Sequence, residues 1–171
     1  MTEISIDALA ATECEVLRVC VGGHVVAVPA IAVREILEPL PVTPLPGALA
    51  AVEGLVDVHG EALAAVDLRS RLATAAPPTS QLLLVRDDAT GRATCVRVDR
   101  VMELWHLALG HVLPPPAVAG GIARYVLGVL PGGVPLLDLT EILEESDRVR
   151  LDEMLAALAE DAPPPGDPSG A

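Results

Sequence analysis

Short apolar runs, separated by glycines, prolines and polar turns, dominate the sequence and predict strands rather than long helices. Apolar and polar side chains alternate from Val16 to Val21, which is typical of a strand with one buried face. Gly22-Gly23 is a two-residue hairpin turn, and residues 24–28 form its return strand. The same pattern predicts a strand over residues 61–68. Two further hairpins are expected, over residues 81–98 and 125–139.

Helical periodicity is confined to a few segments. Residues 29–37 are predicted to form a short helical turn, because Pro29 stands early and apolar residues follow at helical spacing. Residues 140–145 and 147–160 also predict helix. The last of these carries an apolar stripe made by Val149, Leu151, Met154, Leu155 and Leu158.

Changes in composition divide the chain. We expect a flexible leader over residues 1–14, one domain of two lobes over 15–145, a C-terminal helix over 146–161 and a disordered tail over 162–171. Inside the domain, residues 73–80 are small and proline-containing without periodicity, which favours an internal linker.

A weak internal repeat supports two lobes. Residues 26–37 resemble 95–104, and residues 54–72 resemble 128–143, at an offset of about 70 residues in both pairs. The second pair shares the pattern Asp-Leu-x-x-x-Leu. Two similar sets of hairpins suggest two small β-barrels packed together, and a chance likeness between apolar strands is the alternative.

Composition and charge narrow the function. Half of the residues are apolar, mostly Ala, Val, Leu and Ile, and the only large aromatic residues are Trp105 and Tyr125. The formal net charge is −13, and every basic residue other than histidine is arginine. Nucleic acid and anionic membrane surfaces would be repelled, whereas a partner with a basic face would be attracted.

Several observations predict a soluble cytoplasmic protein. The first residues are acidic and lack the basic region of a signal peptide. No run approaches the ~18 apolar residues that span a membrane. Cys14, Cys20 and Cys95 have no Cys-x-x-Cys spacing, which fits reduced thiols.

The residues of an active site are not evident. Ser70, His59 and Asp67 could be assembled into a triad on paper, but no serine stands in a Gly-x-Ser-x-Gly turn. The histidine spacing does not favour a metal, and no phosphate-binding or dinucleotide-binding pattern occurs. We expect no cofactor, no metal and no catalysis; a small hydrolase or metal enzyme is the alternative from another class. The four histidines are His24, His59, His106 and His111.

Several stretches resemble the CheW family in their order and spacing. The likeness runs from about Val16 to Leu143 and includes the C-terminal helix. The stretches that carry it are V-R-E-I (33–36), V-x-x-L-P-G (42–47), E-G-L-V-D-V-H-G-E-A-L-A-A-V-D-L-R (53–69), V-R-V-D-R-V-M-E-L (96–104) and Y-V-L-G-V-L…L-L-D-L-T-E-I-L (125–143).

The resemblance implies a mainly β fold: two intertwined SH3-like five-stranded β-barrels with short helices and a C-terminal helix. It implies a non-catalytic adaptor that couples a CheA-type histidine kinase to the cytoplasmic hairpin tips of methyl-accepting chemoreceptors. Such an adaptor is cytoplasmic and is recruited to receptor arrays at the membrane, without inserting into it. An adaptor of a twitching or developmental pathway is the alternative within the family.

The resemblance also implies partner-binding residues, with receptor helices entering a groove between the barrels. The family usually has Asn-Leu-Arg-Gly where this chain has Asp57-Val58-His59-Gly60. Because the family arginine lies near the glutamate of V-x-E-I, His59 is expected to face Glu35. The predicted set is Val33, Glu35, Ile36, Gly54, Leu55, His59, Gly60, Asp67 and Arg69.

Residue chemistry alone leaves other roles open for this set. Glu35 and His59 could simply be solvated at the surface. The two glycines could serve tight turns or close backbone approach. Asp67 and Arg69 could form a structural ion pair rather than a partner surface.

Overall fold

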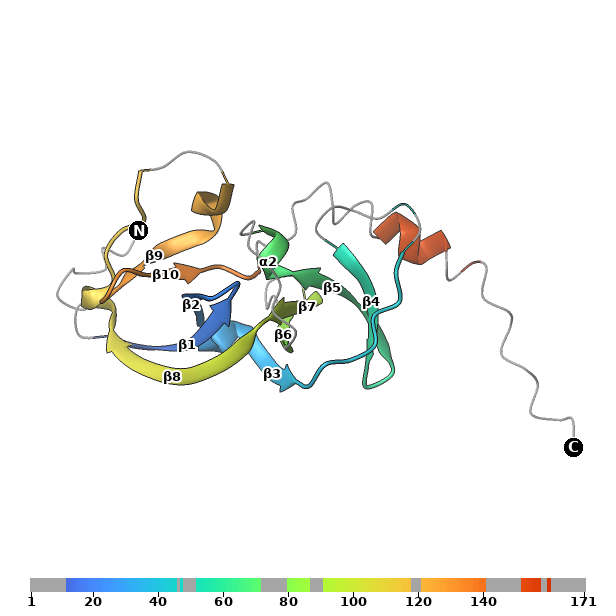
Figure 1. Ribbon diagram of the computed structural model, residues 1–171, viewed down its shortest axis with the longest axis horizontal. Coiled ribbons are helices and arrows are strands. Elements are labelled where there is room, and N and C mark those ends of the chain that lie inside the picture. Colours follow the sequence, from blue (N-terminus) through green and yellow to red (C-terminus); the bar gives the residue numbers. More distant parts are fainter. Residues whose placement is uncertain are drawn as a thin grey trace, which may run out of the picture.

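The computed structural model describes residues 12–45, 47, 52–71, 80–86, 91–117, 121–140, 152–157 and 160. Its strands form two five-stranded sheets (Figure 1). The first sheet has the order β8 (Arg100–Ala108), β1 (Glu13–Val21), β2 (His24–Pro29), β10 (Val134–Leu137), β9 (Val126–Leu130). The second has the order β3 (Val33–Leu37), β6 (Gln81–Arg86), β7 (Ala93–Val98), β5 (Glu61–Asp67), β4 (Val52–Val58). The predicted mainly β fold is confirmed.

The two sheets are built from both halves of the chain. Strands β1 and β2 share their sheet with β8, β9 and β10, whereas β6 and β7 share theirs with β3, β4 and β5. Replacing β1–β5 by β6–β10, and the reverse, converts one strand order into the other. The two halves of the chain therefore have the same arrangement of strands, as the internal repeat predicted. They are intertwined because each half contributes strands to both sheets. Closure of each sheet into a barrel stays a prediction.

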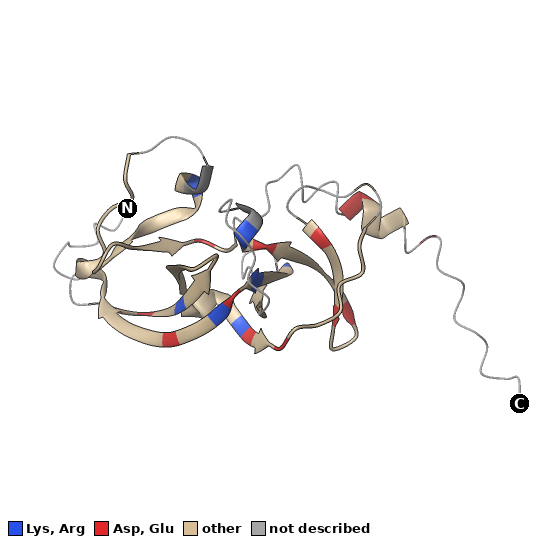
Figure 2. Cartoon of the chain, in the orientation of Figure 1, with Lys and Arg blue, Asp and Glu red and all other residues tan. Residues whose placement is uncertain are grey.

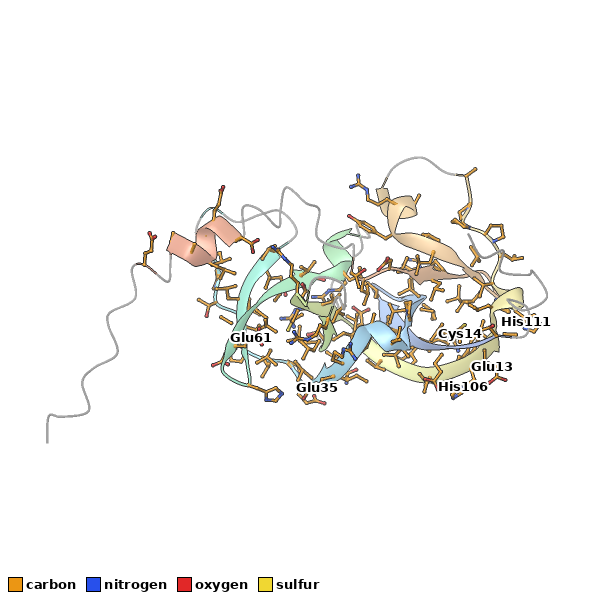
Figure 3. The ribbon with its side chains drawn as sticks, turned by 180° about the vertical axis from the view of Figure 1, so that it is seen from behind. Glu13, Cys14, Glu35, Glu61, His106 and His111 are labelled. Carbon is orange, nitrogen blue, oxygen red and sulfur yellow. The ribbon has the colours of Figure 1, made fainter. Side chains whose placement is uncertain are left out.

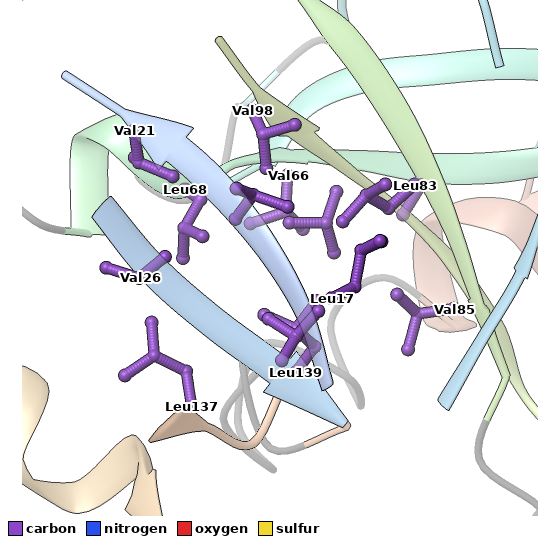
Figure 4. Packing of buried hydrophobic residues seen from close by; sticks show 14 of the residues in the cluster. Leu17, Val21, Val26, Val66, Leu68, Leu83, Val85, Val98, Leu137 and Leu139 are labelled. Atoms are coloured by element: carbon purple, nitrogen blue, oxygen red, sulfur yellow. The ribbon is translucent and has the colours of Figure 1, made fainter. Parts of the chain in front are cut away.

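One large core lies between the sheets and takes side chains from both of them (Figure 4). From the first sheet, Leu17 and Val28 enter it; from the second, Val66 and Leu83 do so. Alternate positions along each strand point away from this core, because side chains of a strand alternate between faces.

The opposite faces are buried too. On the first sheet, Val16 and Ala27 belong to a smaller cluster, and on the second, Leu82 and Cys95 belong to another. Burial raises the pKa of the Cys95 thiol to about 11. Strands buried on both faces explain the near-continuous apolar runs of the sequence.

The segment after Pro29 is a correction to the prediction. Only Ala30–Ala32 turn, as a 3-10 helix, and β3 follows immediately as a strand, paired with β6 through partners such as Ile36 and Leu83. The predicted helical turn over 29–37 is wrong because backbone pairing with β6 overrides a weak local pattern. Two β-branched residues, Val33 and Ile36, also favour the strand.

Two strand boundaries also differ from expectation. β1 begins at Glu13, three residues before the predicted start, and pairs there with Ala108. β8 was not expected as a strand at all, although it is one of the two longest. Both differences have one cause, since the two strands pair with each other over most of their length.

The C-terminal part is described over residues 152–157, which are helical as predicted. Met154 and Leu155 are partly buried against the large core, and Asp152 Oδ2 lies 2.6 Å from Arg92 Nη2. The leader before Thr12, the tail and almost all of the predicted linker lie outside the described residues. No helix in the described part of the chain is long and apolar enough to cross a membrane.

Two glycines occupy equivalent positions of the repeat and allow a close backbone approach. Next to Gly54, Leu55 exchanges two backbone hydrogen bonds of 2.8 Å with Thr43. Next to Gly128, Val129 exchanges two of 2.9 Å with Leu113. A Cβ on Gly54 would lie 2.1 Å from the Thr43 carbonyl oxygen, and one on Gly128 would lie 2.8 Å from that of Leu113. The glycines are therefore required by geometry.

Gly54→Ala should destabilise the fold more than Gly132→Ala. Both glycines have positive φ, +155° and +86°, but a Cβ on Gly132 would meet nothing within 4 Å. The turn variant should therefore lose only about 1 kcal/mol of backbone strain, and the strand variant about 1–3 kcal/mol more from the clash. Urea unfolding of both variants measures the difference. Equal losses would contradict the close approach at Gly54.

Candidate functional site

A groove lies between β3 and β8, each an outer strand of its sheet. It contains a cavity of about 390 Å³, to which β1, β3, β8 and the turn before β3 contribute. The lining residues are Leu17, Ala30, Val33, Arg34, Glu35, Ile36 and Leu104. The groove therefore combines strands from both sheets.

The lining is mainly apolar and open to solvent. Ile36 and Leu104 are 46% and 47% exposed, which is unusual for large apolar side chains placed side by side on one surface. The charged lining residues, Arg34 and Glu35, are adjacent on β3 (Figure 2). An apolar floor with charges on one wall suits the apolar face of a partner helix better than a polar small molecule.

Glu35 and His59 meet at the surface beside this groove. His59 Nε2 lies 3.0 Å from Glu35 Oε2, so the expected facing of the two side chains is confirmed. Both side chains are exposed, at 72% and 42%, and Glu35 extends outward from β3 (Figure 3). An ion pair this exposed contributes at most about 1 kcal/mol, and only while the histidine is protonated.

The turn between β4 and β5 fixes where His59 stands. His59 has a φ of +53°, the only positive φ of a non-glycine residue in the described ranges, and Gly60 follows with +87°. The Gly60 N–H donates a 2.8 Å hydrogen bond to Asp57 Oδ1, which closes the turn. Gly60 is thus a turn glycine, placed where the chain reverses between β4 and β5.

The remaining predicted residues do not line the cavity. Gly54 and Leu55 lie on β4, at the opposite edge of the sheet from β3. Leu55 is partly buried against the large core. The structure thus brings Val33, Glu35 and Ile36 together and places His59 next to Glu35. Gly54 and Leu55 lie outside the cavity, on β4.

Asp67 and Arg69 form part of a buried polar junction. Arg69 is only 7% exposed, and its Nε and Nη2 each lie 2.8 Å from an oxygen of Asp67. Its Nη1 lies 3.9 Å from Oδ1 of Asp99. The hydrogen bond that Arg69 donates to the Asp67 carboxylate, more than the charge of Asp99, raises the pKa of the Arg69 guanidinium. This burial favours the structural ion pair over a partner contact.

Asp99 connects this junction to the first sheet. It stands between β7 and β8, where the chain passes from the second sheet to the first. Its Oδ2 accepts a 3.2 Å hydrogen bond from the N–H of Gly23 in the β1–β2 turn. The junction therefore joins the ends of strands from both sheets.

Three residues that line the cavity, Leu17, Arg34 and Leu104, were not predicted from the sequence. Leu17 and Leu104 are partners in the β1–β8 pairing, and Arg34 precedes the predicted residue Glu35 on β3. A signal for Leu104 exists in the repeat, since V-M-E-L (101–104) matches V-R-E-I (33–36). Its role could be found only by knowing that β8 lies opposite β3.

Another exposed contact between a histidine and a glutamate lies on the first sheet. His106 Nδ1 lies 3.2 Å from Glu15 Oε1, and both side chains are mostly exposed. Within the described ranges, no group of three or more histidine, cysteine or acidic side chains is arranged to hold a metal ion.

The fold and the groove define a class: a mainly β module of two strand-exchanged halves with an apolar groove between its sheets. Comparison with known proteins agrees. The CheW-like domain family matches residues 15–147, and the chain belongs to this family.

Individual relatives extend the comparison. The chain is 30% identical to the chemotaxis protein CheW of Rhizobium meliloti (strain 1021) over 139 residues, which cover 78% of this chain and 90% of that protein. The crystal structure of the scaffolding protein TtCheW from Thermoanaerobacter tengcongensis superposes with a TM-score of 0.71 at 18% identity, covering 80% of this chain and 96% of that one. That structural likeness supports the fold.

Arg69→Gln should lower the free energy of unfolding by about 3 kcal/mol, because the buried carboxylate of Asp99 and the partly buried one of Asp67 lose their cation. Arg100→Gln, at an exposed position on β8, should change it by no more than about 0.5 kcal/mol. Chemical unfolding compares the two. A loss for Arg69→Gln no larger than that of the control would show that the junction does not hold the sheets together.

Proposed function

We propose that the chain is a non-catalytic adaptor that couples a CheA-type histidine kinase to methyl-accepting chemoreceptors. Membership in the CheW-like family supports the adaptor role, as do the names of a chemotaxis protein and a scaffolding protein among its relatives. The observation that carries the proposal is the groove between β3 and β8.

The groove is the proposed receptor site. A receptor hairpin tip is made of amphipathic helices, and an amphipathic helix lays its apolar face into an apolar groove. Ile36 and Leu104 already expose large apolar side chains there, so binding would remove apolar surface from water without unfolding the protein. Val33 and Leu17 form the deeper lining.

The predicted partner residues then take different roles. Val33, Glu35 and Ile36 contact the receptor, and His59 holds the carboxylate of Glu35 at the rim. Gly54 and Gly60 shape the backbone, with Leu55 packing beside the core. Asp67 and Arg69 act from inside, by joining the sheets that form the groove walls.

Signal transfer through such an adaptor requires only linkage. If kinase and receptor bind together, a change of receptor state alters kinase activity through differential contacts, and no chemistry occurs on the adaptor. The protein would work in the cytoplasm and be recruited to receptor arrays. Its net charge of −13 favours partners with basic faces and opposes binding to polyanions.

Reconstitution tests this function. A CheA-type kinase and membrane-embedded receptors are mixed with and without the protein, and ATP turnover is followed as receptor ligand is added. We expect ligand control of the kinase only when the protein is present. Kinase activity that ignores the protein, together with no binding to either partner, would overturn the proposal.

Leu104→Ser should weaken receptor binding at least tenfold, which corresponds to about 1.4 kcal/mol. Leu127→Ser is the matched control, because Leu127 on β9 is 48% exposed but does not line the cavity. Calorimetry with a two-helix receptor tip fragment measures affinity, and thermal melting checks folding. Equal effects of the two variants would remove the groove from the receptor site.

Glu35→Arg should also weaken receptor binding without lowering the melting temperature, because it reverses a charge of the groove wall and removes only an exposed contact with His59. Glu38→Arg makes the same charge change at an exposed position just after β3 that does not line the cavity. It should leave affinity within about twofold, as expected for a screened surface charge. Unchanged affinity for Glu35→Arg would exclude this carboxylate from the interface.

A further inference from the structure

The C-terminal helix is described over residues 152–157 and is held by two kinds of contact. Met154 and Leu155 are partly buried against the large core, whereas the other residues of the segment are exposed. Asp152 uses both carboxylate oxygens to pair with Arg92, at 2.6 and 3.4 Å. The helix follows β10 of the first sheet in the sequence, but Arg92 immediately precedes β7, so the ion pair joins the helix to the second sheet.

These contacts hold the helix only weakly. The side chains of Arg92 and Asp152 are 48% and 52% exposed, and an ion pair this exposed contributes little to stability. An isolated helix shorter than about 12 residues is marginal in water, so the described segment depends on its docking. Segments with few buried apolar contacts open locally while the rest of the domain stays folded. We therefore expect the helix to exchange between a docked and an undocked state.

The ion pair bears on the strand that supports one wall of the groove. β3 provides most of the residues that line the cavity, and it is an outer strand whose neighbour in the sheet is β6. β6 ends at Arg86, which donates a 2.8 Å hydrogen bond to the carbonyl oxygen of Gly91, next to Arg92. At the same end of β6, Val85 is the partner of Val33 on β3. Arg92 therefore holds the helix beside the end of β6 that supports Val33.

Apolar packing connects the same parts. Val85 belongs to the large core on which Met154 and Leu155 pack. Leu17 belongs to this core and Val33 packs against it, and both of them also line the cavity. The terminal helix and the lining of the groove thus pack on one cluster of side chains. Because a closely packed interior transmits strain, a change at the helix reaches the groove.

We infer that the docked C-terminal helix holds the β3 wall in its binding conformation and so raises the affinity of the groove for a receptor helix. The helix stabilises the end of β6, and β6 holds β3. When the helix undocks, the wall loses this support, and a receptor helix must then order the wall as it binds, at a cost in affinity. The inference rests on the proposed function, because it assigns a regulatory element to the same groove.

Charge variants of the ion pair test the effect on affinity. Asp152→Arg places two arginines together and should weaken binding of a two-helix receptor tip fragment about threefold, in the range that one exposed ion pair allows. Adding Arg92→Asp restores an ion pair of opposite polarity and should recover the affinity. Glu153→Arg is the matched control, since it makes the same charge change at the next exposed position of the helix. Calorimetry measures all four proteins.

Hydrogen exchange measures the reciprocal effect, which a helix with a purely structural role would not show. If docking raises affinity for the fragment, bound fragment must favour docking by the same factor. Saturation with the fragment should therefore slow amide exchange over residues 152–157 by about threefold or more in the unaltered protein.

Two results would overturn the inference alone: exchange in the helix that ignores the bound fragment, or equal affinities of the Asp152→Arg and Glu153→Arg variants. Failure of the fragment to bind the unaltered protein would overturn the proposed function, and the inference with it.

Discussion

The exchange of β3–β5 and β8–β10 between the sheets is the constraint on which the other features depend. Each sheet combines two neighbouring strands of one half of the chain with three strands of the other half, which include both of its edge strands. Neither half can therefore complete a sheet alone, and the core between the sheets forms only when both are present. Small branched side chains suit this arrangement, because strands packed on both faces leave little room for aromatic residues.

Because the sheets exchange strands, the chain must pass from one sheet to the other. The passage from β7 to β8 contains a buried acidic residue, Asp99. Asp99 would be costly there without partners. The N–H of Gly23 donates a hydrogen bond to Oδ2, and Arg69 Nη1 lies 3.9 Å from Oδ1, which accepts no hydrogen bond within the described part of the chain. A buried ion pair adds little net stability over an apolar substitute, but its charges lie close together in only one geometry. The junction therefore specifies how the sheets meet more than how tightly they hold.

Local sequence patterns predicted the hairpins, because their strands pair with neighbours in the sequence. The hairpins around Gly22-Gly23 and Pro131-Gly132-Gly133 follow from alternation and turn residues, and the structure contains both. The β3 strand did not follow, because its pairing with β6 is set far away in the sequence. The groove shows the same division. Resemblance to the family indicated Val33, Glu35 and Ile36, while Leu104 depends on the strand exchange, which residue patterns express only as a faint repeat.

The groove is itself a product of the exchange. β3 and β8 are the first strands after the chain passes from one sheet to the other. Each lies at an edge of its sheet, and residues of both line the cavity. Edge strands usually avoid exposing large apolar side chains, since these promote aggregation. Exposure of Ile36 and Leu104 at the two edges therefore favours aggregation of the protein on its own. A partner that covers the groove would bury both side chains, so the topology that exposes them also provides a binding surface.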